Sequence, residues 1–157
     1  MKRYTYLFGL VLCSLTGCEP DDICLAETPG TPQLILVFYD ASQPENKKEV
    51  FNLQVKGVDL DTDIHNGTVD SIAVPLKIND DMTSLVFTKS DNNMLLEESI
   101  AFTYSSYDCF ISRACGYQKN FTTLGAERSN PAVWIENFEI LTDTISDIKT
   151  THVKILH

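Results

Sequence analysis

The feature that most limits the possible folds is a succession of short segments rich in β-branched and aromatic residues, which begins after Pro32. Apolar and polar residues alternate in many of these segments, and turn-forming residues separate them at fairly even intervals. No segment carries a helical apolar stripe longer than about two turns. We predict strands over residues 34–39, 50–56, 69–78, 85–88, 100–104, 107–113, 117–124, 133–141 and 153–156. Pro75 marks the third of these as an edge strand or a bulge.

Eight or nine strands in about 125 residues are typical of an all-β, antiparallel β-sandwich of the immunoglobulin-like kind. A small β-barrel is the alternative. Hydrophobic residues make up 43% of the 157 positions, which is enough to fill a core. We therefore expect one β-sandwich domain over residues 33–157, with Trp134 in its core.

The first seventeen residues have the pattern of a lipoprotein signal peptide. Lys2 and Arg3 precede an apolar run over residues 6–15, which is too short to span a bilayer. The run leads into Leu-Thr-Gly-Cys ending at Cys18, which resembles the bacterial lipobox, in which the cysteine is acylated and becomes the mature N-terminus. We expect cleavage after residue 17, lipidation of Cys18 and a lipidated tether over residues 18–32. The alternatives are an ordinary secretory peptide and a buried N-terminal strand.

The charge balance excludes one class of partner and bears on location. The chain has 12 Lys and Arg against 22 Asp and Glu, a net charge of -10, so we expect no nucleic-acid partner. Removal of residues 1–17 leaves 10 basic against 22 acidic residues, a net of -12. Residues 19–22, Glu-Pro-Asp-Asp, resemble an export signal of Bacteroidota lipoproteins and equally suit a solvated acidic tether. We expect lipid anchorage to the outer membrane, on its periplasmic or its surface-exposed face.

Three cysteines remain for the fold after processing, Cys24, Cys109 and Cys115. In an extended strand, six residues would separate Cys109 from Cys115 by about 20 Å, whereas bridged Cα atoms lie about 6 Å apart. The exported compartment is oxidising, so a bridge from Cys24 to one of the other two is plausible. We choose Cys24–Cys115; the alternative is that all three are reduced.

Complete catalytic and cofactor motifs are absent from the sequence, and we expect no cofactor. It has no Gly-x-Ser-x-Gly elbow, no phosphate-binding glycine loop and no His-Glu-x-x-His. His65, His152 and His157 lack ligand spacing, so we interpret them as surface residues.

A weak calcium candidate lies at Asp59, Asp61 and Asp63, which occupy positions 1, 3 and 5 of an EF-hand-like loop. Ile64 stands where that loop needs glycine, and no flanking helices are predicted. A solvated acidic loop is the favoured interpretation.

Two short segments concern modification. Residues 70–72 and 143–145 have the order Asp, Ser or Thr, then an apolar residue. They resemble the O-glycosylation motif of exported Bacteroidota proteins, which makes Ser71 and Thr144 candidate acceptors.

Three stretches of the chain resemble a family of flavobacterial lipoproteins catalogued as a domain of unknown function. They are Cys-Glu-Pro-Asp-Asp-Ile-Cys over 18–24 with Thr-Pro-Gly-Thr-Pro over 28–32, Ser-Arg-Ala-Cys-Gly-Tyr over 112–117, and His-Val-Lys-Ile over 152–155. The resemblance covers the whole mature chain. Members share cysteines that match Cys24 and Cys115 but not Cys109, which supports the chosen pairing. The resemblance implies a location and no activity.

We expect, from these observations, a non-catalytic lipoprotein of the cell envelope, either structural or a binding module for a protein or glycan partner. The alternative is an envelope glycan hydrolase that uses surface carboxylates. A concave pocket with converging carboxylates would favour the enzyme. Exposed aromatic residues on a flat surface, such as Tyr104 and Tyr107, would favour binding.

Overall fold

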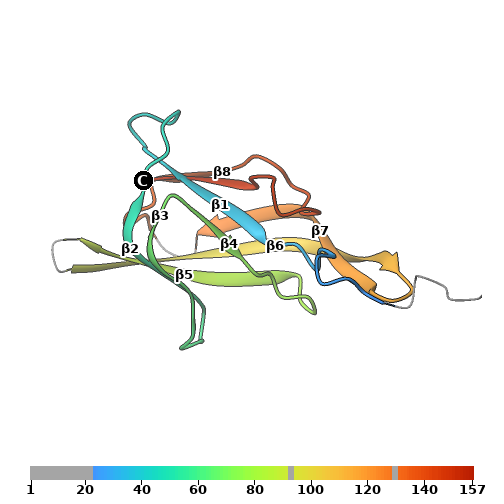
Figure 1. Ribbon diagram of the computed structural model, residues 1–157. Coiled ribbons are helices and arrows are strands. Elements are labelled where there is room, and N and C mark those ends of the chain that lie inside the picture. The colour runs from blue at the N-terminus through green and yellow to red at the C-terminus, as the bar shows by residue number, and fades with distance from the viewer. Residues whose placement is uncertain (1–22, 92–93, 129–130) are drawn as a thin grey trace, which may run out of the picture. The chain divides into compact units, whose positions relative to one another are not determined.

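All regular structure in the described residues of the computed structural model is β-strand; these residues are 23–91, 94–128 and 131–157 (Figure 1). The nine strands are β1 (Leu34–Tyr39), β2 (Val50–Gly57), β3 (Asp63–Val69), β4 (Ser71–Val74), β5 (Met82–Asp91), β6 (Met94–Ser112), β7 (Gly116–Arg128), β8 (Asn137–Ile140) and β9 (Val153–Leu156). The predicted signal peptide and the lipidated Cys18 lie outside the described residues and stay predictions.

The strands form two sheets, with the orders β4-β1-β9-β8 and β3-β2-β5-β6-β7. Within the described residues these sheets do not close into a barrel. The prediction of an all-β sandwich is therefore confirmed, and the alternative of a small β-barrel is wrong. The pair β1–β9 is parallel, in contrast to the antiparallel pairs that β1 forms with β4 and β9 forms with β8. More than 100 residues separate β1 from β9 in the sequence, so the intervening chain supplies the long crossover that a parallel pair requires.

The chain divides into two compact units. The described part of unit 1 consists of residues 23–28 and 110–117, which include the turn between β6 and β7. Unit 2 takes the described residues of 29–109 and 118–157, and it holds the hydrophobic core.

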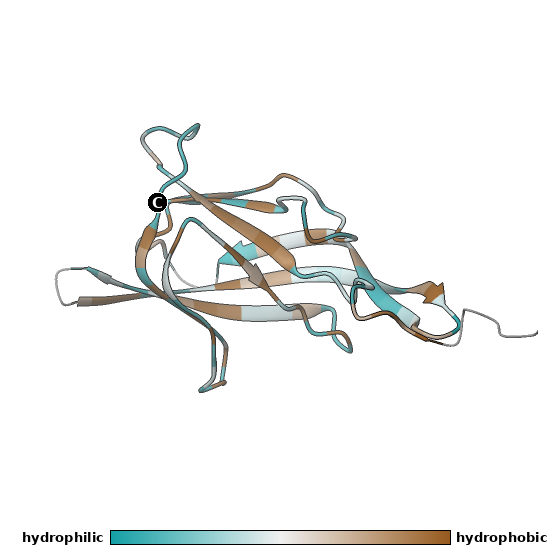
Figure 2. Ribbon diagram, viewed as in Figure 1, coloured by the Kyte–Doolittle hydropathy of each residue, from teal (hydrophilic) through white to brown (hydrophobic). Residues whose placement is uncertain are grey.

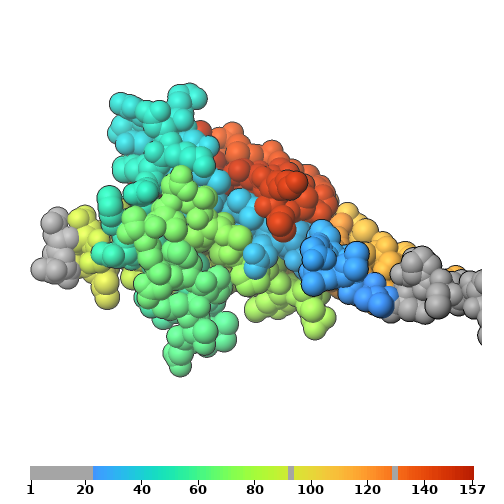
Figure 3. Space-filling model, in the orientation of Figure 1, coloured from blue at the N-terminus to red at the C-terminus, as the bar shows by residue number. Residues whose placement is uncertain are grey.

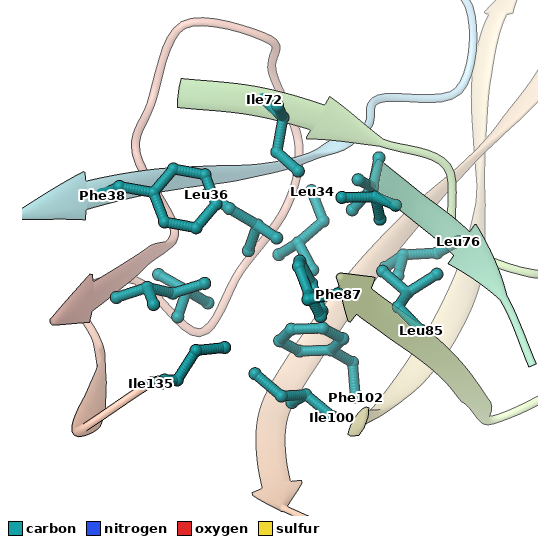
Figure 4. Packing of buried hydrophobic residues seen from close by; sticks show 14 of the residues in the cluster. Leu34, Leu36, Phe38, Ile72, Leu76, Leu85, Phe87, Ile100, Phe102 and Ile135 are labelled. Carbon is teal, nitrogen blue, oxygen red and sulfur yellow. The ribbon is translucent and has the colours of Figure 1, made fainter. Parts of the chain in front are cut away.

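Side chains from both sheets fill the core of unit 2. Alternate residues of a strand point to opposite faces, so β6 directs Ile100, Phe102 and Tyr104 inward. Figure 4 shows Leu34, Leu36 and Phe38 of β1 in this cluster together with Phe87, Ile100 and Phe102. In Figure 2, β1 is hydrophobic along its length, whereas the loop over residues 40–49 is largely hydrophilic. The core explains why the apolar runs form strands and the polar stretches connect them.

Several strand boundaries differ from the sequence prediction. Residues 100–104 and 107–113 were expected as two strands, but they belong to the single 19-residue β6. Residues 63–68 were not predicted as a strand, but together with Val69 they form β3, an edge strand whose side chains are all partly or fully exposed and which therefore has no apolar alternation. β4 lies at a sheet edge and ends directly before Pro75, as the proline indicates.

Candidate functional site

A hollow of about 620 Å³ in unit 2 is the best candidate for a binding site. Its volume falls within the range of ligand sites, roughly 300 to 1,000 Å³. It lies between the β2–β3 turn, the segment after β4 and the first half of β5. The lining is mostly apolar and consists of Gly57, Val58, Asp59, Leu60, Ile64, Pro75, Leu76, Lys77, Thr83, Ser84 and Leu85. Figure 4 shows Leu76 and Leu85 of this lining side by side.

The β2–β3 turn forms one wall of the hollow and projects from the surface of unit 2 (Figure 3). Val58 N donates to Ser84 O at 3.0 Å, and Leu60 N donates to Gly57 O at 3.1 Å. A Cβ on Gly57 would lie 2.7 Å from Leu60 Cδ1, so glycine at this position lets the Leu60 side chain fold back over the turn. Asp59 adopts a positive φ of 62°, which aspartate tolerates better than most residues.

A buried hydrogen-bond network holds the opposite wall. The Tyr104 hydroxyl lies 2.6 Å from Thr83 Oγ1 and donates to Lys77 O at 2.9 Å, while Lys77 N donates to Thr83 Oγ1 at 2.9 Å. Burial raises the pKa of Tyr104, so the hydroxyl keeps its proton at neutral pH. The network fixes residues 75–77 to β5 and β6, and it gives the hollow a rigid side.

Of the two aromatic residues whose exposure would favour binding, only one meets that criterion. Tyr104 is 4% exposed because it shares the inward face of β6 with Phe102. Tyr107 is exposed. Trp134 is buried in the core, as predicted.

The calcium candidate does not assemble into a site. Asp59 and Asp61 lie in the β2–β3 turn, whereas Asp63 begins β3 and accepts hydrogen bonds from Gln54 Nε2 and Asn66 Nδ2. Within the described part of the chain, no group of three or more His, Cys, Asp or Glu side chains could hold a metal ion. The acidic stretch is a turn, because β3 starts within what would have been the ligand loop.

Both candidate modification residues carry the same local hydrogen bond. Ser71 Oγ donates to Asp70 Oδ1 at 2.8 Å, and Thr144 Oγ1 donates to Asp143 Oδ1 at 3.0 Å. Both residues are half-buried. Each hydroxyl therefore already has an acceptor one residue before it.

Two histidines that were predicted at the surface are buried. His152 is fully buried, and its Nδ1 accepts a hydrogen bond from Ile35 N at 3.0 Å. His157 is 8% exposed and packs edge-on against Phe38 and Trp134. Burial lowers the pKa of both. Sequence spacing missed them because their partners on β1, Ile35 and Phe38, lie more than 100 positions away in the sequence.

The sequence did not single out the charged side chain with the deepest burial, Glu98. This residue is fully buried, and its Oε2 accepts from Val133 N, Trp134 N and Ile135 N at 3.3, 3.1 and 2.9 Å. Its Oε1 lies 2.6 Å from Arg128 Nε. Arg128 also donates to Ile135 O at 2.7 Å. The pair fixes the segment that leads into β8, so its role is structural.

The disulfide predicted from the sequence is present. Cys24 and Cys115, 91 positions apart in the sequence, are bonded in unit 1, with their Cα atoms 4.8 Å apart. Cys109 is a half-buried free thiol. Cys115 N donates to Ser112 Oγ at 3.0 Å, which stabilises the turn that carries the bridge.

A second hollow, of about 590 Å³ and widely open to solvent, carries two adjacent carboxylates. It is lined by Ile78, Asn79, Asp80, Asp81, Ser106 and Lys119. Asp80 forms an ion pair with Lys77 at 3.5 Å and accepts from Asp81 N at 3.1 Å. The two carboxylates are neighbours on one loop, whereas glycosidases hold theirs on opposite sides of a bound sugar.

A family model described as a family of unknown function, DUF6452, matches residues 52–157. No curated protein and no solved structure matches the chain. In the part that the structure describes, no helix has the length and apolar character needed to cross a membrane.

Proposed function

This chain belongs to the DUF6452 family of unknown function, and we propose that it is a non-catalytic lipoprotein of the cell envelope that binds a protein partner through its apolar hollow. The anchor is the acylated Cys18, and the location is the outer membrane. The 620 Å³ hollow is the observation that carries the binding function.

The lipobox-like sequence and the disulfide support the envelope location together. Disulfides persist in exported proteins and are rare in the reducing cytosol. Cys24 follows Cys18 by only six residues, so the bridge to Cys115 ties the tether to the folded chain close to its lipid. Two or more acyl chains hold a protein stably at a bilayer, each buried CH₂ contributing about 0.8 kcal/mol.

The chemistry of the hollow favours a protein partner over a glycan. Its walls offer the side chains of Leu60, Ile64 and Leu76, with Asp59 and Lys77 as its charged residues. Glycan sites need many hydrogen-bonding groups and an exposed aromatic face, and none of the described residues that line the hollow is aromatic. An apolar side chain from a partner would replace water in this hollow.

The hydrolase alternative would use Asp80 and Asp81 in the second hollow. The ion pair with Lys77 and the position of both carboxylates on one loop count against it. Loss of an envelope-glycan hydrolase activity in Asp80→Asn/Asp81→Asn, with unchanged folding, would support the enzyme and refute the non-catalytic proposal.

Site-specific photocrosslinking in intact cells tests the binding function. Benzoylphenylalanine replaces Leu60, which is 57% exposed at the hollow, and in a control it replaces Ile148, which is 62% exposed outside the hollow. We expect one defined protein adduct at position 60 and none of the same mass at position 148. Adding Ser84→Tyr, which fills the hollow, should abolish the adduct. Identical adducts at both positions, or an adduct that persists with Ser84→Tyr, would contradict the proposal.

A further inference from the structure

We propose that the described part of unit 1, residues 23–28 and 110–117, contacts the surface of the lipid bilayer through its exposed apolar side chains. The inference rests on the proposed lipid anchor at Cys18. It adds a second, non-covalent membrane contact made by the folded chain.

The disulfide limits how far this unit can lie from the anchor. Six residues separate Cys18 from Cys24, and an extended chain spans at most about 3.3 to 3.6 Å per residue, so the segment reaches about 20 Å. The Cα atoms of Cys24 and Cys115 are 4.8 Å apart. The turn between β6 and β7 is therefore held within about 25 Å of the acylated residue, whatever path the tether takes.

Exposed apolar side chains are concentrated in the same unit. Four of the sixteen large apolar side chains exposed in the described residues belong to it, although it supplies only fourteen of those residues. Ile23 and Leu25 flank the bridged Cys24 and are 75% and 65% exposed. Phe110 and Tyr117 are 56% and 67% exposed and pack edge to face, with ring centroids 5.3 Å apart. Aromatic pairs of this kind suit the boundary between lipid headgroups and acyl chains.

The described part of unit 1 has no net formal charge, so it lacks the electrostatic repulsion from an anionic bilayer that the acidic chain as a whole would have. The whole sequence has a net charge of -10, which disfavours approach to an anionic bilayer. The fourteen described residues of unit 1 contain one acidic and one basic residue, Glu27 and Arg113. The acidic residues of 19–22 lie between the anchor and Ile23 in the sequence, and carboxylates belong in the hydrated headgroup layer. The contact is thus interfacial, about 5 to 10 Å deep, and does not span the bilayer.

Tryptophan fluorescence in vesicles tests the contact. The lipidated mature protein, residues 18–157, is reconstituted into phosphatidylethanolamine and phosphatidylglycerol vesicles, with and without lipids brominated in the upper acyl chain. The reporter is Tyr117→Trp in unit 1. The control is Phe51→Trp on β2 in unit 2, because the two wild-type side chains are equally exposed at 67%. Wild-type protein supplies the background of the buried Trp134.

We expect a blue shift and bromine quenching for Tyr117→Trp, and neither for Phe51→Trp. Flotation of the wild-type protein with the vesicles is measured in parallel. If the protein floats and both reporters respond alike, the contact proposal is overturned and the anchor stands. If it does not float, the anchor proposal fails and the contact proposal fails with it. If the Tyr117→Trp fluorescence is not quenched by brominated lipid but shifts to the blue when an envelope protein is added, the surface binds a protein. That result would likewise refute the bilayer contact.

Discussion

Replacement of Glu98 by glutamine should destabilise the domain strongly, although the side chain keeps its size. Glu98 is fully buried, accepts hydrogen bonds from three consecutive backbone N–H groups and pairs with Arg128. Glutamine removes the negative charge and leaves the Arg128 guanidinium, 21% exposed, without its counter-ion. It also gives the site one acceptor oxygen in place of two.

The magnitude follows from the burial of the pair. Breaking a buried ion pair by removing one partner costs about 3 to 5 kcal/mol. The partial exposure of Arg128 places Glu98→Gln near the lower end, at about 3 kcal/mol. For a domain of this size that lowers the melting temperature by about 6 to 12 °C. Total stability is on the order of 5 to 15 kcal/mol, so the variant should fold but with a reduced margin.

The assay is urea unfolding followed by Trp134 fluorescence, with Glu97→Gln as the matched control. Glu97 is the neighbouring residue on β6 and is exposed, so its replacement should cost less than about 0.5 kcal/mol. The double variant Glu98→Gln/Arg128→Met measures the coupling between the two positions. Equal effects of Glu98→Gln and Glu97→Gln would refute the assignment of Glu98 as a structural charge.

Three further predictions concern the bridge, pH and the hollow. Replacing both Cys24 and Cys115 by serine should cost about 2 to 5 kcal/mol in urea unfolding, because the bridge closes a loop of 91 residues; no change would show that the bridge does not constrain the unfolded chain. Burial lowers the pKa of His152 below 6.5, so the unfolded chain binds more protons than the folded one under mildly acidic conditions. The free energy of unfolding should therefore fall as the pH drops below about 6.5. His152→Asn, which keeps an acceptor for Ile35 N, should weaken this pH dependence. If the free energies of unfolding of the two proteins change in parallel from pH 7.5 to 5.5, His152 is not the source of the dependence. Leu60→Asp should leave stability within about 0.5 kcal/mol, because Leu60 is 57% exposed, but it should abolish partner crosslinking from benzoylphenylalanine at Val58, which also lines the hollow and is 41% exposed. An unaltered adduct at Val58 would remove the hollow from the binding function.

Local patterns in the sequence predicted the strands that lie in the middle of the sandwich. β1 and β9 match their predicted ranges, and both are interior strands of their sheet. β1 is a continuous apolar run, whereas β9 alternates buried Val153 and Ile155 with half-buried Lys154 and Leu156. β3 was missed because an edge strand with no buried side chain has no period to detect. The predicted boundaries of β6 were wrong because the strand continues past Tyr104 into an exposed stretch, where apolar and polar residues no longer alternate.

The alternation of residues along β6 also indicates which of its polar side chains point into the core, and the sequence prediction did not use it for Glu98. Glu98 lies two residues before Ile100 and four before Phe102, so period-two alternation places it in the core with them. The same alternation places Tyr104 inward. The partners of these side chains could not be derived locally, because Arg128 and Lys77 lie 30 and 27 positions away. Likewise the hollow is formed by three separate stretches of the chain, and no single stretch indicates it.

The most direct test of a lipid-anchored, disulfide-tied envelope protein is the intact mass of the protein purified from native membranes. The predicted mass is that of residues 18–157 plus acyl groups on Cys18, and reduction should add two hydrogens from the Cys24–Cys115 bridge. Cys18→Ser should abolish both the acyl mass and recovery from the membrane fraction. An uncleaved chain, or a mature chain without lipid, would contradict the account.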